Sequence, residues 1–224
     1  MRIGFDIDGV LAAFVPAYQA LTVRLAGGDN KFHPDDIINP PCWNWPEFRG
    51  YSDDLMKQVW GEIVASPNFW RRLLPISMNV NALELVIESL EHRHDVYFIT
   101  SRPGMSAKRQ TEGWLTTYLL YDDPDVRPTV LLASDKGAVA KALKLDCYLD
   151  DNLDNIKSVL RESPKTRAYL LNRSYNRGEA FVYRTPEGRL VKEGENITNL
   201  ILVGHRAIRV NSLAEMLDAE LANL

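Results

Sequence analysis

The sequence Phe5-Asp6-Ile7-Asp8-Gly9-Val10-Leu11 follows a short apolar run that begins almost at the first residue. Side chains two residues apart in a strand point to the same side, so Asp6, at the end of the expected strand, and Asp8 can converge on one small volume. Two carboxylates that close repel each other and raise each other's pKa unless a cation lies between them. A hard divalent cation such as Mg2+ prefers oxygen ligands. The stretch therefore predicts a pair of catalytic aspartates with a metal ion beside them.

The same pattern of two aspartates and a glycine also occurs in surface turns and in calcium-binding loops. A calcium loop needs further acids at set offsets and a glutamate at its twelfth position. Here the chain continues with the apolar residues 10–14 instead. Gly9 allows the chain to turn sharply away from the strand. We therefore favour the catalytic interpretation.

The composition is that of an ordinary globular protein. Of its 224 residues, 46% are hydrophobic and 25% are charged, which is enough for one sizeable core and a small accessory domain. The net charge of −4 and the isoelectric point near 5.6 argue against a general nucleic-acid-binding surface, so no stable nucleic-acid partner is expected. A local basic pocket for one phosphate remains compatible with this charge.

We expect a cytoplasmic protein without a membrane partner. The chain opens with a strand and two aspartates instead of a basic and apolar leader, and no apolar run approaches the ~18 residues of a membrane span. Its cysteines are only Cys42 and Cys147, and they lack the spacing of a metal site. We therefore predict buried or free thiols in a reducing compartment.

The segment after the first strand has a different character from the rest of the chain. Residues 14–25 have the pattern of a helix, and Ser52 is a candidate N-cap for a second helix that ends near residue 65. Between them, residues 29–51 are rich in proline, which excludes a regular helix or a central strand there. The pattern of residues 14–76 therefore predicts a small helical cap.

From residue 79 onward, helices alternate with short apolar strands. A capping box at Asn81-x-x-Glu84 predicts the start of the first of these helices. We expect further helices at 106–121 and 136–143 and strands at 95–100, 129–133, 147–150 and 167–171. This alternation predicts an α/β protein with a parallel sheet that carries helices on both faces.

The C-terminal part is less regular. Residues 181–184 and 190–192 predict a β-hairpin within an insertion near 178–204, and a capping box at Ser212-x-x-Glu215 predicts a final helix. We assign no chemistry to the hairpin, and a dimer contact is an equally good interpretation of it. A homodimer is therefore one expected assembly.

Four polar clusters fall at the carboxyl ends of the expected strands, where open α/β sheets bind their ligands. They are the pair Asp6 and Asp8, the run Thr100-Ser101-Arg102, the helix-opening Lys136, and the pair Asp150 and Asp151. Each cluster alone has an ordinary structural explanation, such as a strand end, a solvated lysine or a helix N-cap. Their shared position indicates one site.

These residue types suit phosphoryl transfer through a covalent aspartyl-phosphate. We interpret Asp6 as the nucleophile and Asp8 as the general acid and base, with both beside the Mg2+ ion. Thr100 and the backbone amides after it would bind the phosphate, and Lys136 would pair with both phosphate and nucleophile. One of Asp150 and Asp151 would bind Mg2+, and the other would orient Lys136 or a water.

The order of these motifs resembles the haloacid dehalogenase (HAD) superfamily of phosphatases. The matching sequences are Asp-Ile-Asp-Gly-Val-Leu, Phe-Ile-Thr-Ser-Arg, Ser-Asp-Lys and Tyr-Leu-Asp-Asp-Asn, which extend from the first strand to about Asn152. More narrowly, the chain resembles the 5′(3′)-deoxyribonucleotidases, which share the helical cap, a phenylalanine at the Phe14 position and a stretch like residues 66–75. The resemblance implies an HAD-like Rossmannoid core of residues 1–13 and 77–224 with a cap of residues 14–76. It also implies Mg2+ dependence and favours Asp151 over Asp150 as a metal ligand.

The second motif departs from these nucleotidases. Those enzymes tend to lack an arginine at the position of Arg102. The sequence Thr-Ser-Arg is more like the motif of polynucleotide 3′-phosphatase domains. We interpret Arg102, together with Ser101, as a contact to the phosphate or the nucleotide, because a guanidinium can bind either with two hydrogen bonds.

Aromatic residues of the cap are candidates for stacking on a nucleobase, which contributes about 1–3 kcal/mol per base. Phe14 is the first choice because it is nearest to the catalytic loop in the sequence. The further candidates are Trp70, Trp43 and Trp45. Packing within the cap is an equally good explanation for each of them.

We therefore expect a Mg2+-dependent phosphatase that hydrolyses (deoxy)ribonucleoside 5′-monophosphates, a 5′-nucleotidase whose partner is its small-molecule nucleotide substrate. One alternative is an HAD phosphatase for another small phosphate ester or for polynucleotide 3′-phosphate ends. Another is a nucleotide-binding module without turnover, which the intact set of acids and Lys136 disfavours.

Overall fold

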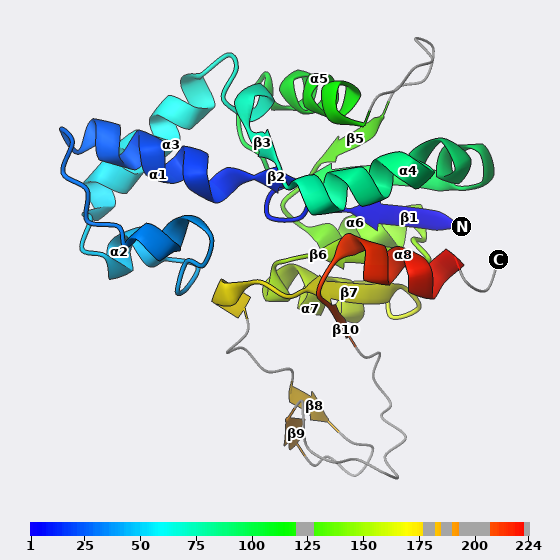
Figure 1. Cartoon of the computed structure of the whole chain (residues 1–224). Helices are drawn as coiled ribbons and strands as arrows, with labels where there is room; N and C mark the ends of the chain where they lie inside the picture. The colour runs from blue at the N-terminus through cyan, green and yellow to red at the C-terminus, as the bar shows by residue number, and fades with distance from the viewer. Residues whose placement is uncertain (120–127, 177–181, 185–189, 193–206, 222–224) are drawn as a thin grey trace.

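A parallel β-sheet forms the centre of the molecule. The computed structural model describes residues 1–119, 128–176, 182–184, 190–192 and 207–221 (Figure 1). Six strands pair in parallel in the order β10-β7-β6-β1-β4-β5. In chain order these strands are β1 (Arg2–Phe5), β4 (Asp95–Thr100), β5 (Thr129–Leu132), β6 (Cys147–Asp150), β7 (Arg167–Leu171) and β10 (Ile208–Val210). The predicted α/β class is confirmed, whereas β10 was not expected.

Helices cover both faces of this sheet (Figure 1). Along β7, Ala168 and Leu170 pack into one apolar cluster with α6 (Lys136–Leu143) and α7 (Leu153–Glu162), while Tyr169 and Leu171 pack into another on the opposite face. This alternation follows from the two-residue repeat of a strand that is buried on both faces. The second cluster includes side chains from α4 (Ser77–Arg93), α5 (Ala107–Tyr118) and α8 (Leu213–Leu221).

A helical cap lies to one side of the core, between two short strands that link it to the sheet (Figure 1). These linking strands, β2 (Ala12–Ala13) and β3 (Leu74–Pro75), pair antiparallel. The cap contains α1 (Phe14–Leu25), the 3-10 helix η1 (Pro34–Ile37), α2 (Trp45–Phe48), α3 (Asp53–Ala65) and the 3-10 helix η2 (Trp70–Arg72). The chain therefore leaves the core directly after residues 5–11 and returns to it at β3.

The predicted helices of the cap are present, with one correction. Ser52 caps α3 by accepting a hydrogen bond from the backbone N–H of Leu55 at 3.3 Å. The proline-rich segment also contains the single-turn helix α2, although we expected no regular helix there. Pro46 lies in its first turn, where no backbone N–H is needed for the helix.

Two predicted capping boxes differ from the structure. The helix expected to start at Asn81 begins a turn earlier, because Val80 N–H already donates to the carbonyl of Ile76, so Asn81 lies within α4. At α8, Ser212 accepts from Glu215 N–H at 3.2 Å as expected, but the Glu215 carboxylate accepts from Asn211 N–H instead of closing the box.

The C-terminal hairpin is present as β8 (Val182–Arg184) and β9 (Leu190–Lys192), which pair antiparallel. The remainder of the insertion predicted near 178–204 lies outside the described residues. Cys42 and Cys147 are free thiols, as expected. No helix in the described part of the chain is long and apolar enough to cross a membrane.

Candidate active site

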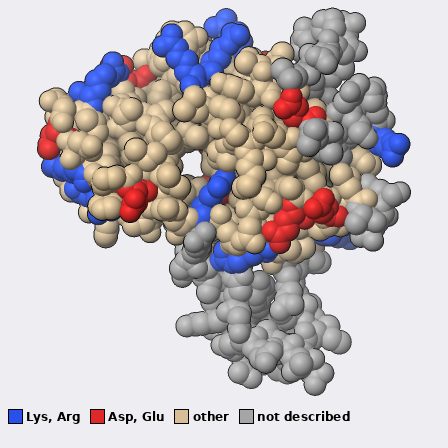
Figure 2. Space-filling view, viewed as in Figure 1, with Lys and Arg blue, Asp and Glu red and all other residues tan. Residues whose placement is uncertain are grey.

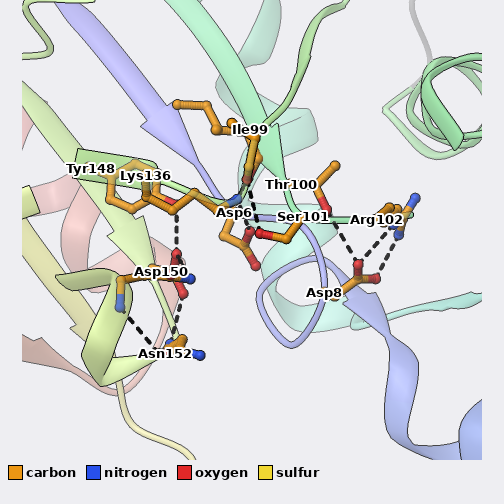
Figure 3. A network of polar contacts seen from close by, with 12 residues as sticks. Asp6, Asp8, Ile99, Thr100, Ser101, Arg102, Lys136, Tyr148, Asp150 and Asn152 are labelled. Carbon is orange, nitrogen blue, oxygen red and sulfur yellow. Dashed lines mark hydrogen bonds and ion pairs between the residues drawn. The ribbon is translucent and has the colours of Figure 1, made fainter. Parts of the chain in front are cut away.

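The four polar clusters meet at one edge of the sheet (Figure 3). Asp6 directly follows β1, Thr100 ends β4, Lys136 begins α6 after β5, and Asp150 ends β6. Strand β1 lies between β4 and β6, where the strand order reverses direction along the chain. Ligands bind outside the carboxyl ends of the strands at such a point. The sheet topology therefore places Asp6 at the centre of the site.

Lys136 lies behind Asp6 and is almost completely buried. Its Nζ is 2.9 Å from Asp6 Oδ1, and it also donates to the carbonyl oxygen of Ile99. Asp135 caps the helix that carries Lys136 by accepting from Ala138 N–H at 3.0 Å. A buried ammonium needs such partners, because an uncompensated buried charge is strongly unfavourable. The predicted pairing of Lys136 with Asp6 is thus present in the structure.

Asp6, Asp150 and Asp151 form a buried carboxylate cluster. One oxygen from each residue lies within 4.8 Å of the other two. Burial, with a contribution from the charges of Asp150 and Asp8, raises the pKa of Asp6 to about 7 despite the opposing charge of Lys136. Burial also raises the pKa of Asp150 and, well above its usual range, that of Asp151. The donor set and its small size suit a hard divalent cation.

The two acids after β6 differ in their hydrogen bonds. Asp150 accepts from the Tyr148 hydroxyl at 2.6 Å, from Asn152 N–H at 2.8 Å and from the side chain of Asn155 at 3.0 Å. These three donors come from its own strand and the following helix, so they hold Asp150 locally. The Asp151 carboxylate accepts from the Tyr175 hydroxyl, which belongs to a segment after β7.

Asp8 lies apart from the carboxylate cluster and pairs with Arg102. The Arg102 guanidinium donates to both Asp8 oxygens, at 2.9 and 2.8 Å, and its third nitrogen donates to the Thr111 hydroxyl at 3.0 Å. The guanidinium also lies 5.1 Å from the centre of the Trp70 ring. Arg102 is 3% exposed, so its donors are directed at protein groups. This geometry differs from the expected contact of Arg102 with phosphate or nucleotide.

The two hydroxyls of the second motif also have protein partners. Thr100 Oγ1 lies 3.4 Å from Asp8 Oδ2, and Ser101 Oγ donates to the carbonyl oxygen of Ala133 at 3.0 Å. Both residues still line the cavity above Asp6. The Ser101 hydroxyl therefore fixes the loop after β4 to the end of β5.

A cavity of about 410 Å3 extends from these acids to the cap. Figure 2 shows an opening between the cap, at the left, and the core. All four aromatic residues expected to stack on a base line the cavity, and the sequence interpretation missed three further aromatic residues there. The aromatic lining comprises Phe14, Tyr18, Trp43, Trp45, Trp60, Trp70 and Tyr175.

These aromatic rings differ in how much of their surface is already covered. Phe14 contacts four other rings, and it lies nearly parallel to Trp60 and Trp70 at centroid distances of 5.8 and 5.9 Å. Trp45 and Trp70 are buried, whereas Trp43 is 38% exposed. Packing therefore accounts for much of the surface of Phe14, Trp45 and Trp70, and Trp43 presents the most accessible ring of the four.

The segment Arg173–Asn176 was missed by the sequence interpretation. Arg173 donates to the carbonyl oxygen of Gly9 at 2.8 Å, and Asn176 donates to that of Asp151 at 2.7 Å. Gly9 has φ +81°, and a Cβ at this position would lie 1.8 Å from Asp151 Oδ2. The segment follows β7, so the rule that polar residues gather beyond parallel strands could have identified it.

Comparison with known proteins agrees with this geometry. A family model described as 5′ nucleotidase, deoxy (Pyrimidine), cytosolic type C protein matches residues 1–203. The chain belongs to this 5′-nucleotidase family. A protein from Oceanobacillus iheyensis that carries a provisional name as a nucleotidase is 27% identical over 194 residues, which cover 80% of this chain and 90% of that protein. This nucleotidase is thus an HAD-superfamily hydrolase of the phosphatase class.

Solved structures show the same fold. An HAD family hydrolase from Deinococcus radiodurans, with bound phosphate and sodium, has a TM-score of 0.54 at 10% identity and covers 99% of this chain and 95% of its own. A haloacid dehalogenase-like hydrolase from Burkholderia xenovorans has a TM-score of 0.52 at 12% identity, covering 99% and 96%. The predicted HAD-like fold of this nucleotidase is confirmed.

Proposed function

We propose that this nucleotidase is a Mg2+-dependent phosphatase that hydrolyses (deoxy)ribonucleoside 5′-monophosphates through an aspartyl-phosphate on Asp6. The observation that carries the proposal is a single cavity that joins the buried carboxylates of the core to the aromatic side chains of the cap. Its size falls within the roughly 300–1,000 Å3 typical of small-molecule sites. The family's name and that of the O. iheyensis relative support a nucleotide as the substrate.

The carboxylate cluster fits the Mg2+ ion that the family resemblance implies. Its three acids are buried and close together, and burial raises their pKa values when no cation compensates their charge. Asp6 and Asp151 would hold the ion, with Asp150 kept beside them by its three hydrogen-bond donors. When bound, Mg2+ would neutralise the negative charge that the phosphate and the acids bring together.

Two aspartates perform the proposed chemistry. A carboxylate oxygen of Asp6 attacks the phosphorus, the bond from phosphorus to the ester oxygen breaks, and Asp8 donates a proton to that leaving oxygen. In the second step, Asp8 accepts a proton from water, whose oxygen attacks the phosphorus. This step releases inorganic phosphate and restores the Asp6 carboxylate.

The neighbouring residues orient these two acids and the phosphate. Lys136 holds Asp6 Oδ1 at 2.9 Å, and its charge offsets the approach of the anionic substrate. Arg102 holds Asp8 with two hydrogen bonds, which fixes the direction of the acid and base. The Thr100 hydroxyl and the backbone amides that follow it would donate hydrogen bonds to the phosphate oxygens.

The nucleobase would lie on the cap side of the cavity. Trp43 is the best candidate for stacking, because its ring is the most accessible of the four expected aromatic residues. Phe14, Trp45 and Trp70 would form the wall behind it. Such a lining favours a substrate with a planar aromatic group over a simple sugar phosphate.

Asp6→Asn tests the mechanism. We expect this variant to lose Mg2+-dependent phosphate release from an aryl phosphate by a factor of about 1,000 or more, because an amide is a far weaker nucleophile than a carboxylate. The matched control is Asp154→Asn, which changes an exposed aspartate of α7. Unchanged turnover in Asp6→Asn would contradict the role of Asp6.

A substrate panel tests the specificity. Nucleoside 5′-monophosphates should have a higher kcat/KM than nucleoside 3′-monophosphates, sugar phosphates and oligonucleotides with a 3′-phosphate. The net charge of −4 disfavours a bound polynucleotide. Preference for the oligonucleotide would replace our substrate assignment with the alternative suggested by Thr100-Ser101-Arg102.

A further inference from the structure

The segment Arg173–Asn176 contacts three separate parts of the site. As described above, Arg173 reaches the catalytic loop at Gly9, and Asn176 reaches the backbone of Asp151. Ser174 Oγ donates to the carbonyl oxygen of Pro40 in the cap at 2.9 Å. The four residues therefore link the cap loop to the catalytic loop and to a candidate metal ligand.

Within this segment, the side chain of Tyr175 contacts both the cap and the core. Its ring contacts Trp43 of the cap, with centroids 4.6 Å apart and an angle of 56° between the planes. Its hydroxyl donates to the Asp151 carboxylate. A displacement of the Trp43 loop would therefore act on the ring whose hydroxyl holds Asp151.

The Asp151 carboxylate is held by a distant part of the chain, whereas the Asp150 carboxylate is held by its neighbours in sequence. The three donors to Asp150 are Tyr148, Asn152 and Asn155, which are close to it in sequence. The Asp151 carboxylate is instead held by a residue 24 positions later in the chain. A Cβ on Gly9 would lie 1.8 Å from Asp151 Oδ2 and 2.8 Å from the Tyr175 hydroxyl, so the pair is packed directly against the catalytic loop.

We propose that Tyr175 is a positioning residue that couples docking of the Trp43 loop to the orientation of Asp151, and so sets the affinity of the site for a divalent cation. This inference rests on the metal site of the proposed function. Groups that orient metal ligands commonly change metal affinity or activity by about 10–100-fold when they are removed. The side chain of Tyr175 thereby links the cap to the metal site, and it does so without a bound substrate.

Tyr175→Phe keeps the ring and removes the hydroxyl. We expect the Kd for Mg2+, measured by titration calorimetry without substrate, to rise about tenfold or more. Tyr169→Phe is the matched control, because the Tyr169 hydroxyl also donates to a carboxylate, that of Glu220 at 2.6 Å, away from the site. The control should leave the Kd for Mg2+ unchanged. An unchanged or lower Kd in Tyr175→Phe would overturn the inference.

A second variant tests the coupling to the cap, and its effect in the otherwise unaltered protein does not depend on the folding of Tyr175→Phe. Trp43→Leu removes the ring that contacts Tyr175, and we expect it to raise the Kd for Mg2+ several-fold. In the Tyr175→Phe background the same substitution should change the Kd by less than about twofold, because no hydroxyl remains to transmit the displacement. Equal effects of Trp43→Leu in both backgrounds would overturn the coupling.

The unaltered protein separates this inference from the proposed function. If it binds Mg2+ and hydrolyses nucleoside monophosphates while Tyr175→Phe binds Mg2+ equally well, only the role of Tyr175 is wrong. If the unaltered protein binds no Mg2+, the proposed metal site and the role of Tyr175 are both wrong.

Discussion

At the residue scale, the structure favours a different role for Arg102 from the one that the sequence suggested. The sequence motif suggested a guanidinium directed at the phosphate, but two of its nitrogens hold Asp8 and the third holds Thr111. The ring of Trp70 covers the guanidinium, and the Trp70 indole N–H is fixed by the carbonyl of Pro103 at 3.2 Å. In the proposed mechanism, Arg102 would therefore act through Asp8.

Arg102→Lys tests this role while keeping the positive charge. A lysine cannot form the two parallel hydrogen bonds of a guanidinium, so Asp8 should lose its fixed direction. We expect kcat to fall about 10–100-fold with little change in KM, measured by steady-state kinetics on a nucleoside monophosphate. Arg109→Lys, which changes an exposed arginine of α5, is the control. A rise in KM at constant kcat would instead support direct contact with the substrate.

At the element scale, the cap loop that carries Trp43 and Trp45 is held by an ion pair. Arg49, directly after α2, donates to both oxygens of Asp36 in η1, at 2.7 and 2.6 Å. Asp36 also accepts from His33 N–H at 2.9 Å and is buried. The hydrogen bonds from Arg49 lower the pKa of Asp36 below its ordinary value of 3.8. These contacts close the proline-rich loop into a defined shape.

Asp36→Asn should lower the Tm by several degrees at neutral pH, because a buried charge-assisted pair is lost. The pKa of Asp36 is lower in the folded protein, so its stabilising effect is complete above about pH 4 and is lost as the pH falls through the folded value. The Tm difference from the unaltered protein should therefore shrink below about pH 4.

Thermal unfolding followed by circular dichroism measures this effect. Asp35→Asn is the matched control, since Asp35 is its exposed neighbour and should change the Tm little. A Tm difference that grows as the pH falls below 4 would contradict the assigned pKa direction.

At the scale of the whole molecule, charged residues that follow or end four strands lie together at one edge of the sheet. Asp6, Asp150 and Asp151 derive from β1 and β6, and their mutual distances are set by parallel pairing of those strands. Burial raises the pKa of each of them, so the protonated forms are stabilised in the folded protein without metal. Their contribution to stability is complete below the unfolded pKa and is lost as the pH rises through the folded pKa.

Mg2+ should oppose this loss of stability at higher pH. We expect the Tm of the metal-free protein to fall as the pH rises from about 5 to 8, and the Tm increase caused by Mg2+ to grow over the same range. At a Mg2+ concentration about 100 times the Kd, the increase at pH 8 should be roughly 5–10 °C. Asp151→Asn should remove most of this increase, as measured by thermal unfolding with EDTA or Mg2+. An increase that is independent of pH would show that protons and Mg2+ do not compete for these acids.

The sequence alone determined the class of the fold and identified most of the polar residues that meet at the candidate site. The repeat of apolar residues predicted β6, β7, α1 and α6 with the bounds that the structure has, because such local patterns follow from burial of one face or both. The polar residues at strand ends identified Asp6, Lys136 and Asp150, because parallel strands bring their carboxyl ends to one edge.

Only the tertiary structure decided which polar groups pair with each other. The partner of Asp8 is 94 residues away, and that of Asp151 belongs to a segment that carries no motif. Such contacts depend on the sheet order and on the position of the cap, which no local pattern contains. The chain sequence thus specifies the acids, whereas the fold decides that Arg102 orients Asp8 and that Tyr175 holds Asp151.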